Sequence, residues 1–124
     1  LADLFIDTLP YNAHTTAGDA LWAGLPALTC PGETFAGRVA ASVLTAMGLP
    51  ELITASIEEY ESLAVALAAD PQRLAMLRQT IEAGRSNTLL FDTVRYTRAM
   101  EDVYTRMVAR SQAGLPPEHL PVAD

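Results

Sequence analysis

The chain has 124 residues, half of them apolar, which is enough for one domain with a buried core and excludes a disordered segment. Its 15 acidic residues and eight arginines, with no lysine, give a formal net charge of −7. An acidic chain without a basic stripe argues against binding to nucleic acid or to anionic membranes. The sequence also lacks an apolar run of about 18 residues, so no membrane span is predicted.

The single cysteine, Cys30, cannot form a disulfide within the chain and is predicted to be a small buried side chain. No signal peptide is visible, which makes a reducing, cytoplasmic setting the expectation. The chain starts without methionine, a few residues before an apolar run. We therefore expect it to be the later part of a larger protein.

Three short apolar runs, at residues 4–6, 27–30 and 52–53, are predicted as strands separated by helices at 15–23 and 35–47. Each helix is followed by Gly-Leu-Pro, at Gly24 and at Gly48, and this is a helix stop. Strands alternating with helices at this spacing predict parallel pairing with right-handed crossovers. The expected fold class is α/β.

From residue 56 onward the pattern is helical. Ser56 and Glu59 form a capping box, and Asp70 before Pro71 is a second helix start. A loop at 85–90 precedes a long helix at 92–110, and the three prolines of residues 114–124 predict a loose tail. The long helix carries an apolar seam that we interpret as ordinary core: Tyr96, Met100, Val103, Tyr104 and Met107.

The most informative residues are His14, Thr15, Thr16 and Asp19, which lie where the first strand leads into the first helix. Free N–H groups and the helix dipole make a helix start a natural site for an anion such as phosphate. Asp19 shares a helical face with the two threonines and offers a carboxylate to ribose hydroxyls. The spacing of Thr16 and Asp19 also fits a simple capping box, so a purely structural role stays open here.

A second loop, at 31–34, leaves the same edge of the predicted sheet, where ligands bind in open α/β folds. Thr34 is a candidate N-cap for the helix that holds Arg38, and turn-and-cap chemistry is the favoured interpretation of this loop. Arg38 has the options of pairing with Glu33 or with a ligand, although a solvated arginine is favoured. His119, in the tail, has no expected role.

Other chemistries lack support. Two histidines 105 positions apart and one cysteine give no metal-binding spacing, and no metal or cofactor is predicted. The chain has no nucleophile elbow, no Walker A motif and no dinucleotide fingerprint, which argues against hydrolase, ATPase and dehydrogenase functions.

The string HTTAGDALWAGLPALTCPGETFAGRVAASVL resembles the C-terminal catalytic half of the O-linked N-acetylglucosamine transferase family, as found in bacterial members. The resemblance extends over nearly the whole chain. These enzymes are glycosyltransferases of the GT-B type, in which two Rossmann-like domains face each other across a cleft. It implies a Rossmann-like half-domain over 1–113, with a short parallel sheet, flanking helices and a helical C-terminal part, followed by the tail at 114–124.

By this resemblance His14, Thr15 and Thr16 hold the diphosphate of UDP-N-acetylglucosamine (UDP-GlcNAc), and Asp19 accepts hydrogen bonds from the ribose. The chain lacks the family's active-site lysine and its candidate catalytic bases, so no catalytic residue is predicted here, and the isolated chain is expected to be inactive. Its implied partners are an upstream catalytic domain of the same protein and a protein acceptor. A tetratricopeptide superhelix would lie upstream if this member has one.

Alternatives remain open at this stage. One is another GT-B glycosyltransferase or a nucleotide-sugar epimerase, for example one that uses GDP-fucose, although Asp19 and the Pro-Gly-Glu-Thr string favour UDP-GlcNAc. Another is a non-catalytic assembly module, against which the intact His14, Thr15, Thr16 and Asp19 count.

Overall fold

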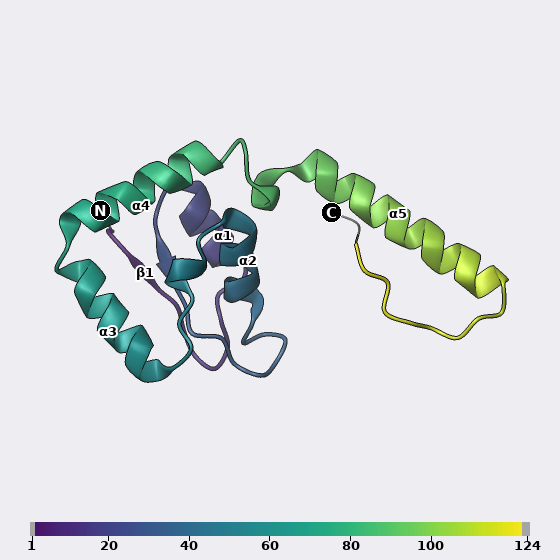
Figure 1. Ribbon diagram of the computed structural model, residues 1–124, viewed down its shortest axis with the longest axis horizontal. Helices are drawn as coiled ribbons and strands as arrows, with labels where there is room; N and C mark the ends of the chain where they lie inside the picture. Colours follow the sequence, from purple (N-terminus) through teal and green to yellow (C-terminus); the bar gives the residue numbers. More distant parts are fainter. Residues whose placement is uncertain (1, 123–124) are drawn as a thin grey trace. The chain divides into compact units, whose positions relative to one another are not determined.

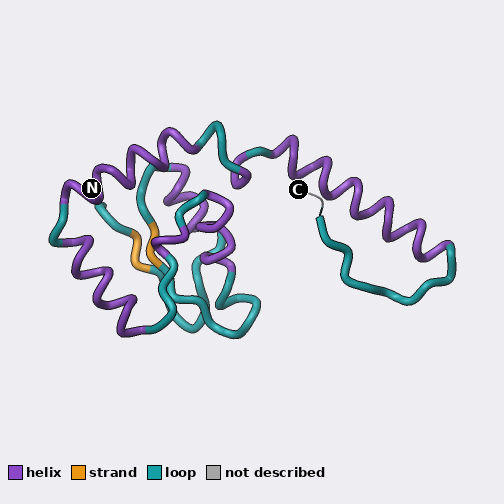
Figure 2. Tube along the Cα trace, in the orientation of Figure 1, coloured by secondary structure: helices purple, strands orange, loops and turns teal. Residues whose placement is uncertain are grey.

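Two short parallel strands lie at the centre of the first part of the chain in the computed structural model, which describes residues 2–122. Strand β1, Phe5–Ile6, pairs with β2, Ala27–Leu28, with Phe5 opposite Ala27 (Figure 2). The third predicted strand is reduced to one parallel bridge between Thr29 and Ile53. Its shortness has a local cause, because Pro50 begins a 3₁₀ turn, η1, over Pro50–Leu52.

The chain divides into two compact units, Leu1–Phe91 and Asp92–Asp124, which we describe separately. The first unit holds the strand pair, and Figure 1 shows β1 lying between α3 and the pair of helices α1 and α2. The second unit holds one long helix and the segment after it. The helical elements are α1 Thr15–Trp22, α2 Val39–Met47, α3 Ile57–Ala68, α4 Pro71–Gly84, η2 Leu89–Phe91 and α5 Thr93–Gln112. None of the described helices is both long enough and apolar enough to cross a membrane.

The two predicted glycine stops end α1 and α2 in the same way. Gly24 and Gly48 have φ angles of 83° and 80°, a left-handed conformation that glycine adopts without a Cβ clash. After each glycine a leucine N–H reaches back to the helix, Leu25 to the Ala20 carbonyl at 2.8 Å and Leu49 to the Leu44 carbonyl at 2.9 Å. These bonds satisfy carbonyls that would otherwise lack partners. The glycine stops are confirmed.

Side-chain caps begin three further helices. The Ser56 hydroxyl accepts from the Glu59 N–H at 3.2 Å, and the Glu59 carboxylate accepts from the Ala55 N–H at 2.9 Å. Asp70 caps α4 through the Arg73 N–H, and Asp92 caps α5 through the Arg95 N–H. The capping box and the Asp70-Pro71 start are confirmed, and each cap pairs one N–H that the helix itself leaves free.

The core is built on both faces of β2. Ala27 belongs to a cluster formed with α1, α2 and α4, in which Leu21, Leu44 and Ile81 are almost completely buried. The next residue, Leu28, belongs to a second cluster with Cys30 and Tyr60 of α3. Successive strand residues point to opposite faces, so burial on both sides is what a parallel strand requires. Cys30 is a buried free thiol, as predicted.

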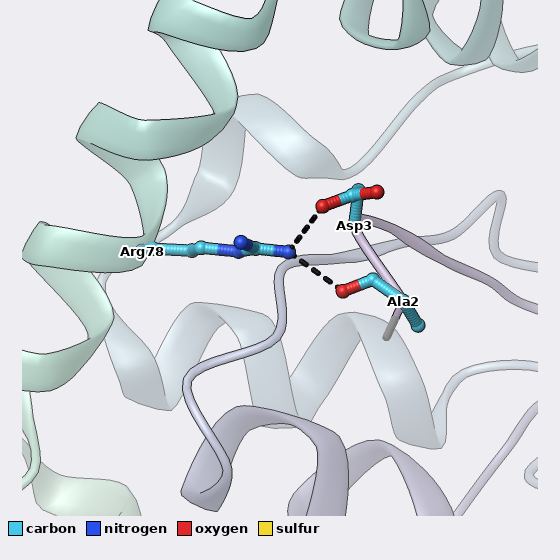
Figure 3. A network of polar contacts seen from close by, with 3 residues as sticks. All are labelled: Ala2, Asp3 and Arg78. Atoms are coloured by element: carbon cyan, nitrogen blue, oxygen red, sulfur yellow. Dashed lines mark hydrogen bonds and ion pairs between the residues drawn. The ribbon is translucent and has the colours of Figure 1, made fainter.

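A polar contact joins α4 to the segment before β1 (Figure 3). One guanidinium nitrogen of Arg78 donates to the carbonyl of Ala2 at 2.6 Å and to the carboxylate of Asp3 at 2.8 Å. The side chain of Asp3 is 77% exposed, so water screens this ion pair and limits its contribution to stability.

In the second unit, the segment after α5 folds back along that helix. Arg110 donates to the Pro116 carbonyl at 2.6 Å and pairs with Glu118 at 2.7 Å, while Arg106 donates to the Pro121 carbonyl at 2.6 Å. Residues 115–122 form no helix or strand, and these bonds tie them to α5; their assignment as a loose tail stays a prediction, and residues 123–124 lie outside the described part. The domain boundary at residue 113 stays a prediction.

The apolar seam of α5 is not buried, contrary to its interpretation as core. Tyr96, Tyr104 and Met107 are more than half exposed, and α5 has no buried residue. The physical reason is that its own unit offers only the short returning segment as a packing surface.

Candidate functional site

Two loops meet where the strands β1 and β2 end. The first, at 8–13, leads from β1 to the N-cap of α1, and the second, at 31–38, leads from β2 to α2. The Asn12 N–H donates to the Ala36 carbonyl at 3.0 Å, which joins them directly. They approach so closely that a Cβ on Gly37 would lie 3.0 Å from the Pro10 carbonyl oxygen. This edge of the sheet is where open α/β folds bind ligands.

Asp7, directly after β1, holds the first loop through its side chain. Its side chain is buried, and one carboxylate oxygen accepts from the N–H groups of Thr8 at 2.8 Å and Ala13 at 2.6 Å. The other oxygen accepts from the Thr29 hydroxyl at 2.6 Å. A buried charge is tolerable only when it is hydrogen-bonded in this way. Asp7 therefore fixes both ends of the loop.

Tyr60 of α3 packs against the same place. Its hydroxyl donates to the Asp7 carbonyl at 2.6 Å, and its ring is buried beside Leu28 and Cys30. Burial raises the pKa of the Tyr60 hydroxyl, and the nearby Asp7 and Cys30 raise it further. The hydroxyl thus stays protonated and keeps donating over a wide pH range.

His14 is the N-cap residue of α1 and lies between the two loops. Its ring stacks on Tyr11, with the ring centroids 5.0 Å apart, and meets Phe35 edge-on at 6.2 Å. Its Nε2 lies 3.4 Å from the Ala36 carbonyl. The side chain of His14 does not cap the helix, so the N–H groups of the first turn of α1 have no side-chain partner there.

Thr15, Thr16 and Asp19 follow His14 on α1, and all three are exposed. Because α1 starts at Thr15, Thr16 is its second residue and cannot be the N-cap of a box with Asp19. That structural alternative is therefore wrong. Within the described residues, Asp19 makes no side-chain hydrogen bond, which leaves its carboxylate open to solvent. The structure places the four candidate residues within one helix start, and their binding role stays a prediction.

The second loop differs from its expected form. Helix α2 begins at Val39, not at residue 35, and Arg38 is its exposed N-cap residue, not a residue one turn inside. Thr34 is therefore not the cap. Its hydroxyl instead accepts from the Gly37 N–H at 3.0 Å within a turn closed by a Gly32 to Gly37 bond of 2.7 Å. Backbone hydrogen bonds inside the turn and to Asn12 keep residues 35–38 out of the helix.

Sequence reasoning missed two buried polar residues of this site, Asp7 and Asn12. Asn12 is fully buried, and its amide donates to the Thr8 carbonyl at 3.0 Å. An acidic residue directly after an apolar run was the available signal for Asp7. Among the described residues no three metal-ligating side chains cluster. A pocket of about 540 Å³ lies elsewhere, near Leu4, Leu74 and Arg78.

A short parallel sheet with flanking helices defines the class as a Rossmann-like α/β half-domain, and the start of α1 lies at the edge where such folds bind ligands. The profile of glycosyl transferase family 41 matches residues 1–100, and the chain belongs to this family. The predicted family membership and fold class are confirmed.

The chain is similar to enzymes much longer than itself. It is 42% identical over 120 residues to a UDP-N-acetylglucosamine--peptide N-acetylglucosaminyltransferase from Caenorhabditis elegans, which covers 97% of this chain and 10% of that protein. A second relative, a probable UDP-N-acetylglucosamine--peptide N-acetylglucosaminyltransferase SEC from Arabidopsis thaliana, is 42% identical over all of this chain and 13% of its own length.

A solved structure of a similar enzyme has the same fold over most of this chain. A mutant of the O-GlcNAc transferase from Thermobaculum terrenum matches with a TM-score of 0.80 and 39% identity, over 85% of this chain and 20% of the other. The chain thus spans between a tenth and a fifth of the length of these relatives.

Proposed function

We propose that this chain is the donor-binding part of an inverting glycosyltransferase that transfers N-acetylglucosamine from UDP-GlcNAc to serine or threonine of a protein. The observation that carries the proposal is the open start of α1, where His14, Thr15 and Thr16 stand together at the ligand-binding edge. The names of the relatives support this donor and this type of acceptor.

The helix start supplies what a nucleotide diphosphate needs. The first N–H groups of α1 carry the positive end of the helix dipole, and the hydroxyls of Thr15 and Thr16 add donors. This matters in a chain without lysine and with a net charge of −7, where bulk charge repels the ligand. We propose that Asp19, an exposed residue one turn further along α1, accepts hydrogen bonds from the ribose hydroxyls.

The same groups assist the reaction. The acceptor hydroxyl oxygen attacks the anomeric carbon, the bond from that carbon to the β-phosphate oxygen breaks, and UDP leaves with the bonding electrons. Donors fixed at the start of α1 stabilise the charge that develops on the diphosphate. We propose that the base that takes the hydroxyl proton, and further cationic groups, come from the part of the protein outside these 124 residues. The isolated chain is then a weak binder without activity.

Calorimetric titration of the 124-residue chain with UDP and GDP tests the proposal. A hydrogen bond to a charged group contributes about 1.5–3 kcal/mol, so His14→Ala and Asp19→Asn should each weaken UDP binding by about tenfold or more. The matched control His119→Ala removes an exposed histidine of the tail and should leave binding unchanged. UDP binding that His14→Ala leaves intact, or tighter binding of GDP, would contradict the proposal.

A further inference from the structure

We propose that Asp7 is the positioning residue of the donor site: its buried carboxylate holds the 8–13 loop and thereby sets the start of α1. This inference rests on the proposed function, because it assigns Asp7 a role in presenting His14, Thr15 and Thr16 to the diphosphate. Asp7 itself is only 5% exposed.

One oxygen atom of Asp7 bonds to both ends of the loop. Oδ1 of Asp7 accepts from the N–H groups of Thr8 and Ala13, the first and last residues of the loop. Ala13 directly precedes His14, the N-cap of α1, and its bond to Asp7 is short at 2.6 Å. Bonds from an N–H to a carboxylate are about twice as strong as bonds between neutral groups. A displacement of this carboxylate therefore moves the helix start.

Asp7 is itself held from two neighbouring elements, through its carboxylate by Thr29 and through its backbone carbonyl by Tyr60. The Thr29 hydroxyl, just after β2, donates to Oδ2 at 2.6 Å, and the Tyr60 hydroxyl of α3 donates to the Asp7 carbonyl at 2.6 Å. Asp7 thus connects the loop to the sheet, through Thr29, and to α3, through Tyr60.

The second loop extends this arrangement to the imidazole. The Ala36 carbonyl accepts from the Asn12 N–H at 3.0 Å and lies 3.4 Å from Nε2 of His14. Asp7 fixes the position of Ala13. The positions of residues 12 and 13 in turn determine how His14 faces the Ala36 carbonyl.

The charge of Asp7 and its positioning role predict opposite effects of Asp7→Asn on UDP binding. A carboxylate near an anion site repels the anion, so removing its charge should strengthen UDP binding if Asp7 had no positioning role. Asp7→Asn keeps the shape of the side chain and one oxygen acceptor but weakens the bonds to Thr8 and Ala13. We expect Asp7→Asn to bind UDP about threefold to tenfold more weakly than the unmodified chain, in the direction opposite to the charge effect.

Thr29→Val is the matched control. It removes one hydrogen bond from the same carboxylate but leaves both bonds to the loop in place. Urea unfolding of both variants measures their stability, and calorimetric titration with UDP measures their affinity. We expect Thr29→Val to bind UDP within about twofold of the unmodified chain. Equal or tighter UDP binding by Asp7→Asn, or an equal loss in Thr29→Val, would overturn the proposal.

A second readout needs no ligand and separates this inference from the proposed function. Hydrogen exchange of the Ala13 amide should be faster in Asp7→Asn, after correction for global stability, and unchanged in Thr29→Val. If the unmodified chain does not bind UDP, the proposed function fails, and the exchange rates alone decide on Asp7. Unchanged exchange at Ala13 in Asp7→Asn would show that its carboxylate does not hold the loop.

Discussion

Tyr60→Phe isolates one hydrogen bond at the base of the candidate site. The substitution removes the hydroxyl that donates to the Asp7 carbonyl at 2.6 Å and keeps the ring that packs on Leu28 and Cys30. A net hydrogen bond contributes about 0.5–1.5 kcal/mol, and a buried acceptor left without a partner costs about 1–3 kcal/mol. We therefore expect Tyr60→Phe to lower the free energy of unfolding by about 1–2 kcal/mol.

Urea unfolding followed by circular dichroism measures this loss at neutral pH. Tyr11→Phe is the control, because Tyr11 is 63% exposed and its hydroxyl makes no hydrogen bond within the described residues. It should change stability by less than about 0.5 kcal/mol. Equal stability of Tyr60→Phe and the unmodified chain would refute the view that α3 is tied to the loop through this bond.

The same variant has a pH signature. Because burial, Asp7 and Cys30 raise the pKa of Tyr60, the unfolded chain loses this proton at a lower pH than the folded chain does. The contribution of Tyr60 to stability is complete below its ordinary pKa of about 10 and is lost as the pH rises from there through the folded-state value. The stability difference between the unmodified chain and Tyr60→Phe should therefore shrink above about pH 10. A difference that stays constant or grows would contradict the assigned environment.

Three further substitutions and one control substitution test the fold. Ser56→Ala removes the cap of α3 and should cost about 1 kcal/mol in the free energy of unfolding, measured in urea. Leu28→Ala opens a cavity in the core and should cost about 2–5 kcal/mol, whereas Val65→Ala, at a residue 70% exposed, should cost less than about 0.5 kcal/mol. Arg78→Met breaks the exposed pair with Asp3 and should cost at most about 1 kcal/mol, a loss that added salt should reduce. Losses in a different order would contradict the assigned burial and caps.

Local chemistry predicted much of the fold. Gly24 and Gly48 were recognisable as helix stops because a left-handed glycine with a proline two residues later ends a helix whatever the rest of the molecule does. Ser56 and Asp70 were recognisable as caps for a similar reason, since each bond spans only three residues. The parallel pairing followed from the alternation of strands and helices.

Tertiary contacts decided what the sequence pattern could not. The segment from Phe35 to Arg38 has a pattern compatible with a helix, but backbone bonds to Asn12 and within the turn hold it as a loop. Asp7 and Asn12 were missed because their burial, and partners such as Thr29 and Ala36, come from parts of the chain 22 or more residues away. Asp19 and the residues at the start of α1 were noticed because an anion site at a helix start is itself a local feature.

The central claim is that the start of α1 binds the diphosphate of a uridine nucleotide. An amide-resolved NMR titration of the 124-residue chain with UDP tests it most directly. We expect shifts concentrated at residues 14–19 and 31–38, weaker with GDP and lost in His14→Ala. Shifts centred elsewhere, for example around the pocket near Leu74 and Arg78, or a spectrum that millimolar UDP leaves unchanged, would contradict it.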